Sequence, residues 1–248
     1  MYLWLMEKEW FASWFDTSYY HTLYKNRNDV EAKQFVVNLI DYLNLQKSTK
    51  VLDLACGKGR HSVTLNELGF DVLGVDLSPA SIASASKHEN ERLHFAVHDM
   101  REVIESTSFG AIFNLFTSFG YFDETSDNKK VLKSIHQMLE IEGILVLDFM
   151  NAKRVIDNLV LEESKTIDGI TFNISRRYDG NHIFKQIDFE DNSESFSYTE
   201  RVQALRKEDF EDLLKSCNFR ILRTFGDFNL SEFHENDSDR LIIIAQKN

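Results

Sequence analysis

Cysteine and positive charge are scarce in this chain of 248 residues. Its two cysteines, Cys56 and Cys217, lie far apart, so no framework of disulfides or zinc ligands follows. We expect a reducing compartment and no metal site. The 28 Lys and Arg residues are outnumbered by 40 Asp and Glu residues, which gives a net charge of −12. Because a nucleic-acid partner requires a basic face, this balance argues against one.

Long hydrophobic runs are also absent. No segment approaches the length of a membrane span, and the apolar start, Met1–Trp10, is short and soon charged. It lacks the basic region and cleavage site of a signal peptide, so we expect a cytoplasmic protein without a membrane partner. The hydrophobic fraction of 43% is nevertheless sufficient for a sizeable core, and the length fits one α/β domain with an insertion or cap.

The most informative stretch is Val51–Ser62, which reads Val-Leu-Asp-Leu-Ala-Cys-Gly-Lys-Gly-Arg-His-Ser. Its apolar beginning predicts a buried strand, its glycines predict a turn, and the apolar spacing beyond them predicts a helix. Such a turn exposes the backbone N–H groups of the helix start, and Gly57 and Gly59 let a ligand approach the chain closely. The stretch therefore predicts a cradle for a nucleotide-like ligand.

Two acidic residues narrow the choice of ligand. Asp53 precedes the glycines, where an acid would repel a pyrophosphate but suits an ammonium or sulfonium group. Asp76 ends the next apolar run, at the distance from which an acid reaches ribose hydroxyls. A ribose contact without a pyrophosphate cradle favours S-adenosylmethionine (SAM) over NAD.

Together with Gly74-Val75-Asp76-Leu77-Ser78 and His98-Asp99-Met100-Arg101, this stretch resembles the class I SAM-dependent methyltransferases, most of all the group that acts on small molecules. The resemblance covers residues 51–148 well and the flanks loosely, and Ala55 replaces the first glycine of the family pattern. It implies a Rossmann-like α/β fold with a seven-stranded sheet of order 3-2-1-4-5-7-6. Strand 7 should be antiparallel, and helices should flank the sheet.

The resemblance also implies which residues bind SAM and its product, S-adenosylhomocysteine (SAH). It assigns the adenine amino group to Asp99, for which a helix cap is the alternative, and a ring nitrogen to the backbone of Met100. Arg60 and His61 either contact the carboxylate end of the cofactor or merely cover the helix. The predicted cofactor-binding set is Tyr20, Asp53, Ala55, Gly57, Gly59, Arg60, Asp76, Leu77, Asp99, Met100, Leu115 and Phe116.

Outside the core, an aromatic N-terminal segment predicts either a lid over the site or a helix packed on the core. Asn28 begins a capping box for a further helix. Turn signals at Asp168, Asp179 and Asp191 predict a small antiparallel sheet after strand five, which would wall the substrate side. The predicted units are a helical lid, the cofactor-binding core, the antiparallel insertion, and the last helix with strands six and seven, at residues 1–45, 46–151, 152–205 and 206–248.

The transferred methyl group should lie near the loop after strand four, at the carboxyl ends of the strands. We expect transfer to O or N of a small metabolite. The candidate general bases are Tyr20, His21, Tyr121, His182 and His234. The acidic loop Gly226–Asp239 either attracts a cationic amine or is a solvated surface loop. A non-catalytic binding protein and an NAD-dependent oxidoreductase are the alternatives, and the oligomeric state is left open, a homodimer included.

Overall fold

The computed structural model describes residues 10–25, 29–122 and 124–248. The beginning of the aromatic segment and the predicted capping residue Asn28 thus lie outside the described residues. Within these ranges, every helix falls short of the length and apolarity that a membrane crossing requires.

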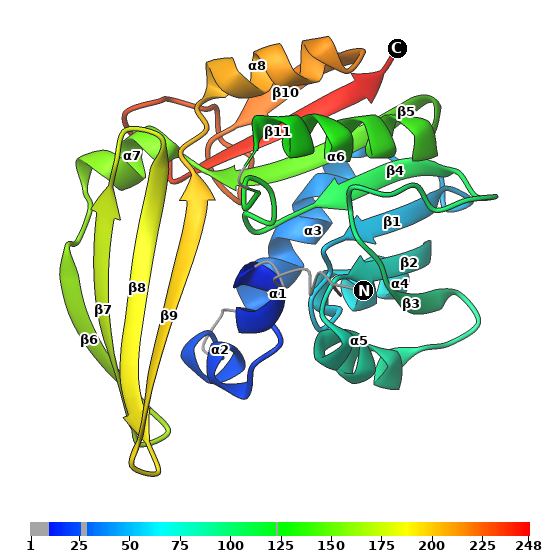
Figure 1. Cartoon of the computed structure of the whole chain (residues 1–248). Helices are drawn as coiled ribbons and strands as arrows, with labels where there is room; N and C mark the ends of the chain where they lie inside the picture. The colour runs from blue at the N-terminus through cyan, green and yellow to red at the C-terminus, as the bar shows by residue number, and fades with distance from the viewer. Residues whose placement is uncertain (1–9, 26–28, 123) are drawn as a thin grey trace, which may run out of the picture.

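A seven-stranded sheet forms the centre of the molecule (Figure 1). Its strand order is β10-β11-β5-β4-β1-β2-β3, and β11 runs antiparallel to both β5 and β10. The predicted order 3-2-1-4-5-7-6 with an antiparallel strand 7 is therefore confirmed. The strands are β1 (Lys50–Leu54), β2 (Asp71–Asp76), β3 (Leu93–Val97), β4 (Phe109–Asn114), β5 (Leu139–Met150), β10 (Phe219–Phe225) and β11 (Arg240–Lys247).

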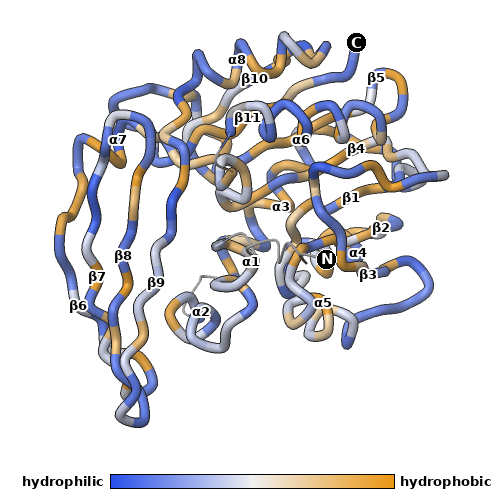
Figure 2. The backbone as a smooth tube through the Cα atoms, viewed as in Figure 1, coloured by the Kyte–Doolittle hydropathy of each residue, from blue (hydrophilic) through white to orange (hydrophobic). Residues whose placement is uncertain are grey.

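Helices cover both faces of this sheet. Figure 2 shows that its strands are largely hydrophobic, as expected for strands that are buried on both sides. Successive residues such as Val51 and Leu52 belong to different core clusters, one on each face. Helices α3 (Asp29–Leu43), α4 (Arg60–Glu67) and α5 (Pro79–Ala85) pack on the first face. Helices α6 (Thr125–Met138) and α8 (Lys207–Ser216) pack on the second. A 3₁₀ turn, η1 (Ser86–His88), and helix α7 (Ala152–Asp157) complete the connections around the sheet.

The insertion after β5 is a second, four-stranded antiparallel sheet of order β6-β7-β8-β9, which confirms the predicted small antiparallel sheet. It consists of β6 (Glu162–Ile167), β7 (Ile170–Tyr178), β8 (His182–Asp191) and β9 (Glu194–Gln203). Its tight turns use left-handed residues, with φ of 51° at both Asp168 and Asn192. One face is polar and exposed. The other carries Phe172, Ile187 and Phe189, which are buried.

Two short helices of the N-terminal segment cover that apolar face. They are α1 (Trp10–Trp14) and α2 (Ser18–Leu23), and Trp14 and Leu23 share one buried cluster with Phe172 and Ile187. Figure 1 shows α1 and α2 between the inserted sheet and α5. The segment thus bridges the two sheets at the edge where β1 and β2 end.

Candidate active site

A cavity of about 480 Å³ opens where the parallel strands end. Its walls include the residues that directly follow β1, β2, β3 and β4. The order of the strands changes direction between β1 and β4, and ligands of open α/β sheets bind at this place. Side chains of α1, α2 and the connection between them, among them Phe15, Tyr20 and His21, close the cavity from the other side.

The turn between β1 and α4 has the geometry that its glycines predict. Gly57 and Gly59 have φ of 56° and 83°, and a Cβ on Gly59 would approach the ring of Phe95 to 2.7 Å. Glycine is therefore required at this position for both backbone and packing reasons. Ala55 has φ of 63°, so an alanine occupies a left-handed conformation that a glycine would adopt without strain.

Asp76 connects this turn with the end of β2. Its carboxylate accepts the N–H of Gly57 at 2.8 Å and that of Ser78 at 2.9 Å, and it faces the cavity. Burial raises the pKa of Asp76, although these hydrogen bonds act in the opposite direction. Helix α5 begins directly after this contact, with Ser78 as cap and Pro79 as the first helical residue.

Asp53 is not part of the cavity wall. It is buried on the sheet face that α4 covers, and Ser62 of α4 donates a hydrogen bond to it at 2.5 Å. Burial raises the pKa of Asp53 to about 6, against the effect of the Ser62 hydrogen bond. Side chains within a strand point to the faces of the sheet rather than beyond its end, which is why the acid lies behind the cavity. Its direct contact with the cofactor remains a prediction.

Asp99 lines the cavity and pairs with Arg101. It accepts the Arg101 N–H at 2.9 Å and a guanidinium nitrogen at 2.6 Å. Burial acts to raise the pKa of Asp99, but the hydrogen bonds from Arg101 outweigh it and lower the value. Because no helix begins near Arg101 in the described chain, the helix-cap alternative for Asp99 is wrong.

Ten of the twelve predicted cofactor-binding residues line the cavity, and Asp53 and Gly59 do not. The residues missed include Cys56, Lys58, Ser78 and His98, which lie in the same turns as the predicted ones. Their position after a strand was the available signal. Burial raises the pKa of the Cys56 thiol, which favours a small residue in a crowded turn over a reactive thiolate.

Comparison with known proteins identifies the family. Residues 45–192 match the model of the methyltransferase domain family. The chain belongs to this family. The predicted class I SAM-dependent methyltransferase is thereby confirmed.

Relatives cover most of this methyltransferase. It is 30% identical to a glycine/sarcosine N-methyltransferase of Halorhodospira halochloris, over 88% of this chain and 83% of the relative. It is 28% identical to the glycine/sarcosine N-methyltransferase of Aphanothece halophytica, over 89% and 83%. The fold matches the crystal structure of a SAM-dependent methyltransferase from Clostridium acetobutylicum with a TM-score of 0.78 and 20% identity, over 93% of this chain and 96% of that one.

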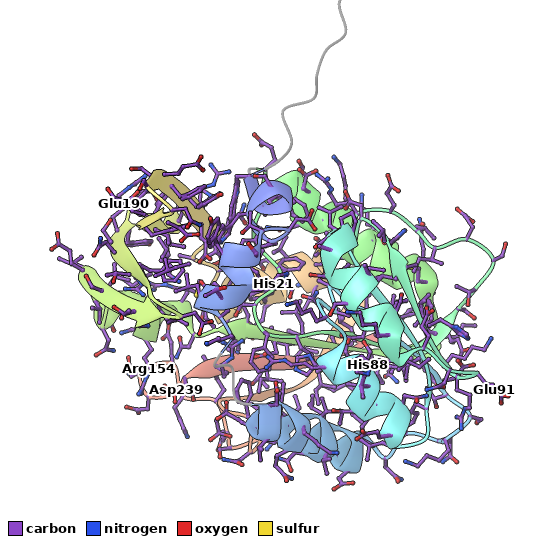
Figure 3. All side chains as sticks on the ribbon, turned by 90° about the horizontal axis from the view of Figure 1, so that it is seen from below. His21, His88, Glu91, Arg154, Glu190 and Asp239 are labelled. Atoms are coloured by element: carbon purple, nitrogen blue, oxygen red, sulfur yellow. The ribbon has the colours of Figure 1, made fainter. Side chains whose placement is uncertain are left out.

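The methyltransferase brings three of the five candidate general bases to the cavity, namely Tyr20, His21 and Tyr121. Figure 3 shows His21 on α2 in the middle of the molecule. His182 and His234 are not among the cavity-lining residues. His182 is the first residue of β8 and pairs with Gln203 of β9. His234 lies in the connection between β10 and β11. Neither position contributes to the cavity wall.

The inserted sheet of the methyltransferase does not form the wall that we predicted. None of the described residues between 152 and 205 lines the cavity, because α1 and α2 lie in between. Trp14 stacks on Tyr198 with ring centroids 4.3 Å apart, so the sheet supports the N-terminal helices. At the other end of the segment, Asp16 accepts hydrogen bonds from Ser78 at 2.6 Å and from the N–H of Ala80 at 3.0 Å.

The acidic loop Gly226–Asp239 contributes no cavity-lining residue either. Asp227 accepts the N–H groups of Asn229 and Ser231 within the loop. Phe228 of the same loop packs on Phe116, which does line the cavity, with ring centroids 5.2 Å apart. These contacts favour a structural role over attraction of a cationic amine.

Proposed function

We propose that this methyltransferase transfers the methyl group of SAM to the nitrogen of a small amine. The observation that carries the proposal is the similarity to the two glycine/sarcosine N-methyltransferases, which extends over 83% of each relative. The similarity also extends over 88–89% of this chain, which is more than the cofactor-binding core alone. Nitrogen is therefore favoured over oxygen as the accepting atom.

The geometry of the cavity is consistent with this chemistry. SAM supplies a methyl group activated by its sulfonium, so the protein mainly has to position the acceptor and exclude water. Phe15, Tyr20 and Tyr121 form an aromatic cluster at the wall, with Phe15 centroids 4.9 and 5.3 Å from those of the tyrosines. An amine attacks as the neutral base, and the candidates for taking the proton that the amine loses are the cavity-lining Tyr20, His21 and Tyr121.

Paired acceptors test the proposal. The enzyme is incubated with SAM and with amines and their hydroxyl counterparts, for example glycine and glycolate, or an amino sugar and its parent sugar, and SAH release is measured. We expect turnover of amines alone. Turnover of hydroxyl compounds alone would show that oxygen is the accepting atom.

Two further measurements address the alternatives. In calorimetric titrations we expect binding of SAM and SAH but not of NADH, and binding of NADH alone would contradict the proposal. His21→Gln is compared with His182→Gln, which changes a histidine outside the cavity. A loss of kcat in the first variant alone would identify His21 as the proton acceptor, and equal rates would exclude it.

We also propose that the enzyme works as a cytoplasmic protein on a small molecule, with the four units bounded near residues 45, 151 and 205. The two cysteines support a reducing compartment, since both are buried and unpaired. Light scattering after size exclusion will distinguish a monomer from the homodimer. Limited proteolysis will show whether the chain is cut near the proposed boundaries.

A further inference from the structure

The turn after β4 has an unusual backbone. Phe116 and Thr117 follow each other with φ of 58° and 60°, and neither is a glycine. Two consecutive left-handed residues with side chains are sparsely populated unless their surroundings fix them. Leu115, Phe116, Thr117 and Ser118 all line the cavity, so the strained turn forms part of the site itself.

One residue of β5 binds both N–H groups of this strained pair. The Asp148 carboxylate accepts the N–H of Phe116 at 2.8 Å, and the main-chain oxygen of Asp148 accepts the N–H of Thr117 at 3.0 Å. Asp148 is completely buried and does not line the cavity. It therefore acts on the site through the turn rather than on a ligand.

Arg240, the first residue of β11, completes the arrangement. Its Nε donates to the free side of the Asp148 carboxylate at 2.8 Å, and a terminal nitrogen donates to the Thr117 hydroxyl at 3.0 Å. A buried carboxylate needs such a partner, since an uncompensated charge away from water is costly. The same guanidinium thus compensates Asp148 and contacts the second residue of the strained pair.

The turn also fixes an aromatic ring at the cavity wall. The ring of Phe116 stacks on Phe228 on one side, while the Arg60 guanidinium lies 4.1 Å from its centroid and His61 packs at 5.0 Å. Arg60 and His61 begin α4, directly after the glycine turn. The conformation at Phe116 therefore links the β4 turn to the glycine turn.

We propose that Asp148 and Arg240 are positioning residues of the methyl-transfer site, which hold Phe116 and Thr117 in the left-handed conformation and so preform the cavity wall. Without the pair, the turn adopts other conformations in the free enzyme. Binding must then restore the wall, and this cost appears as lost affinity. The proposal requires a cofactor site in this cavity but not an amine acceptor.

The first test compares two variants that each change a fully buried residue, and the stability of both is measured. In Asp148→Asn the carboxylate loses its charge, and in Ile243→Ala a core residue of β11 is truncated. The Kd for SAH is measured by calorimetry. The free energy of unfolding is measured by denaturation in urea. We expect Asp148→Asn to weaken SAH binding at least about tenfold more than the control does. Equal losses of affinity at equal stability would overturn the proposal.

The second test asks whether backbone freedom restores the site. Thr117→Gly and Thr117→Ala both remove the hydroxyl that Arg240 contacts, but only glycine adopts the left-handed conformation without strain. In the Asp148→Asn background we expect Thr117→Gly to recover most of the lost SAH affinity and Thr117→Ala to recover none. Equal behaviour of the two would contradict a positioning role.

Thr117→Gly and Thr117→Ala are also compared in the Arg240→Lys background, which is a more conservative change than Asp148→Asn. Arg240→Lys keeps the positive charge but cannot bind both Asp148 and Thr117 through one planar group. If Asp148→Asn does not fold, the glycine and alanine variants in Arg240→Lys decide the question. Wild-type SAH affinity in Arg240→Lys itself would also overturn the proposal.

Discussion

Tyr24, at the end of α2, donates its hydroxyl hydrogen to Glu200 of β9, with its oxygen 2.8 Å from both carboxylate oxygens. The same carboxylate accepts the indole N–H of Trp14 at 2.7 Å and lies 3.7 Å from the Lys185 ammonium. Burial, and then Glu200, raise the pKa of Tyr24 well above its ordinary value, so Tyr24 serves as a donor and not as a base. Because Tyr24 lines the cavity, this contact connects the inserted sheet to the site.

The first prediction concerns Glu200→Gln. An amide cannot accept from Trp14 and Tyr24 while also compensating Lys185, so α1 and α2 lose their fixed position on the sheet. We expect kcat/KM for the acceptor to fall roughly 10- to 100-fold, because small displacements of positioning groups are costly. The SAH affinity should fall less, because Tyr20 is the one residue of α1 and α2 in the predicted cofactor-binding set. Thr199→Ala, on the exposed face of the same strand, is the control, and a parallel loss of SAH affinity in Glu200→Gln would contradict this prediction.

The second prediction concerns the acid at the end of β2. Asp76→Ala removes the acceptor of the Gly57 and Ser78 N–H groups, together with the proposed ribose contact. We expect the affinities for SAM and SAH to fall by about 1.5–3 kcal/mol, the range for hydrogen bonds to charged groups. Calorimetry measures both affinities. Asp71→Ala, at the opposite end of β2, should bind both ligands normally, and normal binding by Asp76→Ala would mean that ribose lies elsewhere.

The sequence predicts those parts of the site that depend on where a residue stands relative to the neighbouring strand in the chain. Asp76 is the last residue of a strand, Gly57 and Asp99 come shortly after one, and the carboxyl ends of parallel strands meet at one edge of a sheet. Asp53 lies within β1, where the alternation of the strand turns its side chain toward α4, and the residue pattern alone does not indicate that it lies outside the cavity lining.

The remaining features depend on contacts between distant parts of the chain. Trp14 and Glu200 are 186 positions apart, and Asp148 and Arg240 are 92 positions apart. In the sequence each of them is an ordinary residue of a predicted element. Nothing local indicates that α1 and α2 separate the inserted sheet from the cavity, nor that His182 and His234 lie outside its lining. Such packing is decided by the three-dimensional arrangement of the elements.

The third prediction is a pH dependence of stability caused by Asp53. Burial raises its pKa to about 6 in the folded enzyme, while the ordinary value is 3.8. Between these values the folded state binds a proton that the unfolded state has lost, so stability decreases as the pH rises. Above about pH 6 the destabilisation is complete, at about 2–3 kcal/mol.

Asp53→Asn tests this dependence, because asparagine keeps an acceptor for the Ser62 hydroxyl without the charge. Urea unfolding at several pH values should show Asp53→Asn to be more stable than the wild type at pH 8. The difference should shrink as the pH falls and disappear below about pH 3, where Asp53 is protonated in both the folded and the unfolded state. A difference that is independent of pH would refute the assigned cause.

The last prediction concerns the alanine that replaces the first glycine of the family pattern. Ala55 has φ of 63°, which costs an L-residue about 1–2 kcal/mol, and glycine relieves this strain. Glycine also makes the unfolded chain more flexible, which lowers the free energy of unfolding by about 0.4–1 kcal/mol. We therefore expect Ala55→Gly to raise the free energy of unfolding by up to about 1 kcal/mol, measured in urea. Ala80→Gly, in the first turn of α5, should lower it, because that position is helical. If both variants were destabilised equally, the left-handed conformation of Ala55 would not be a source of strain.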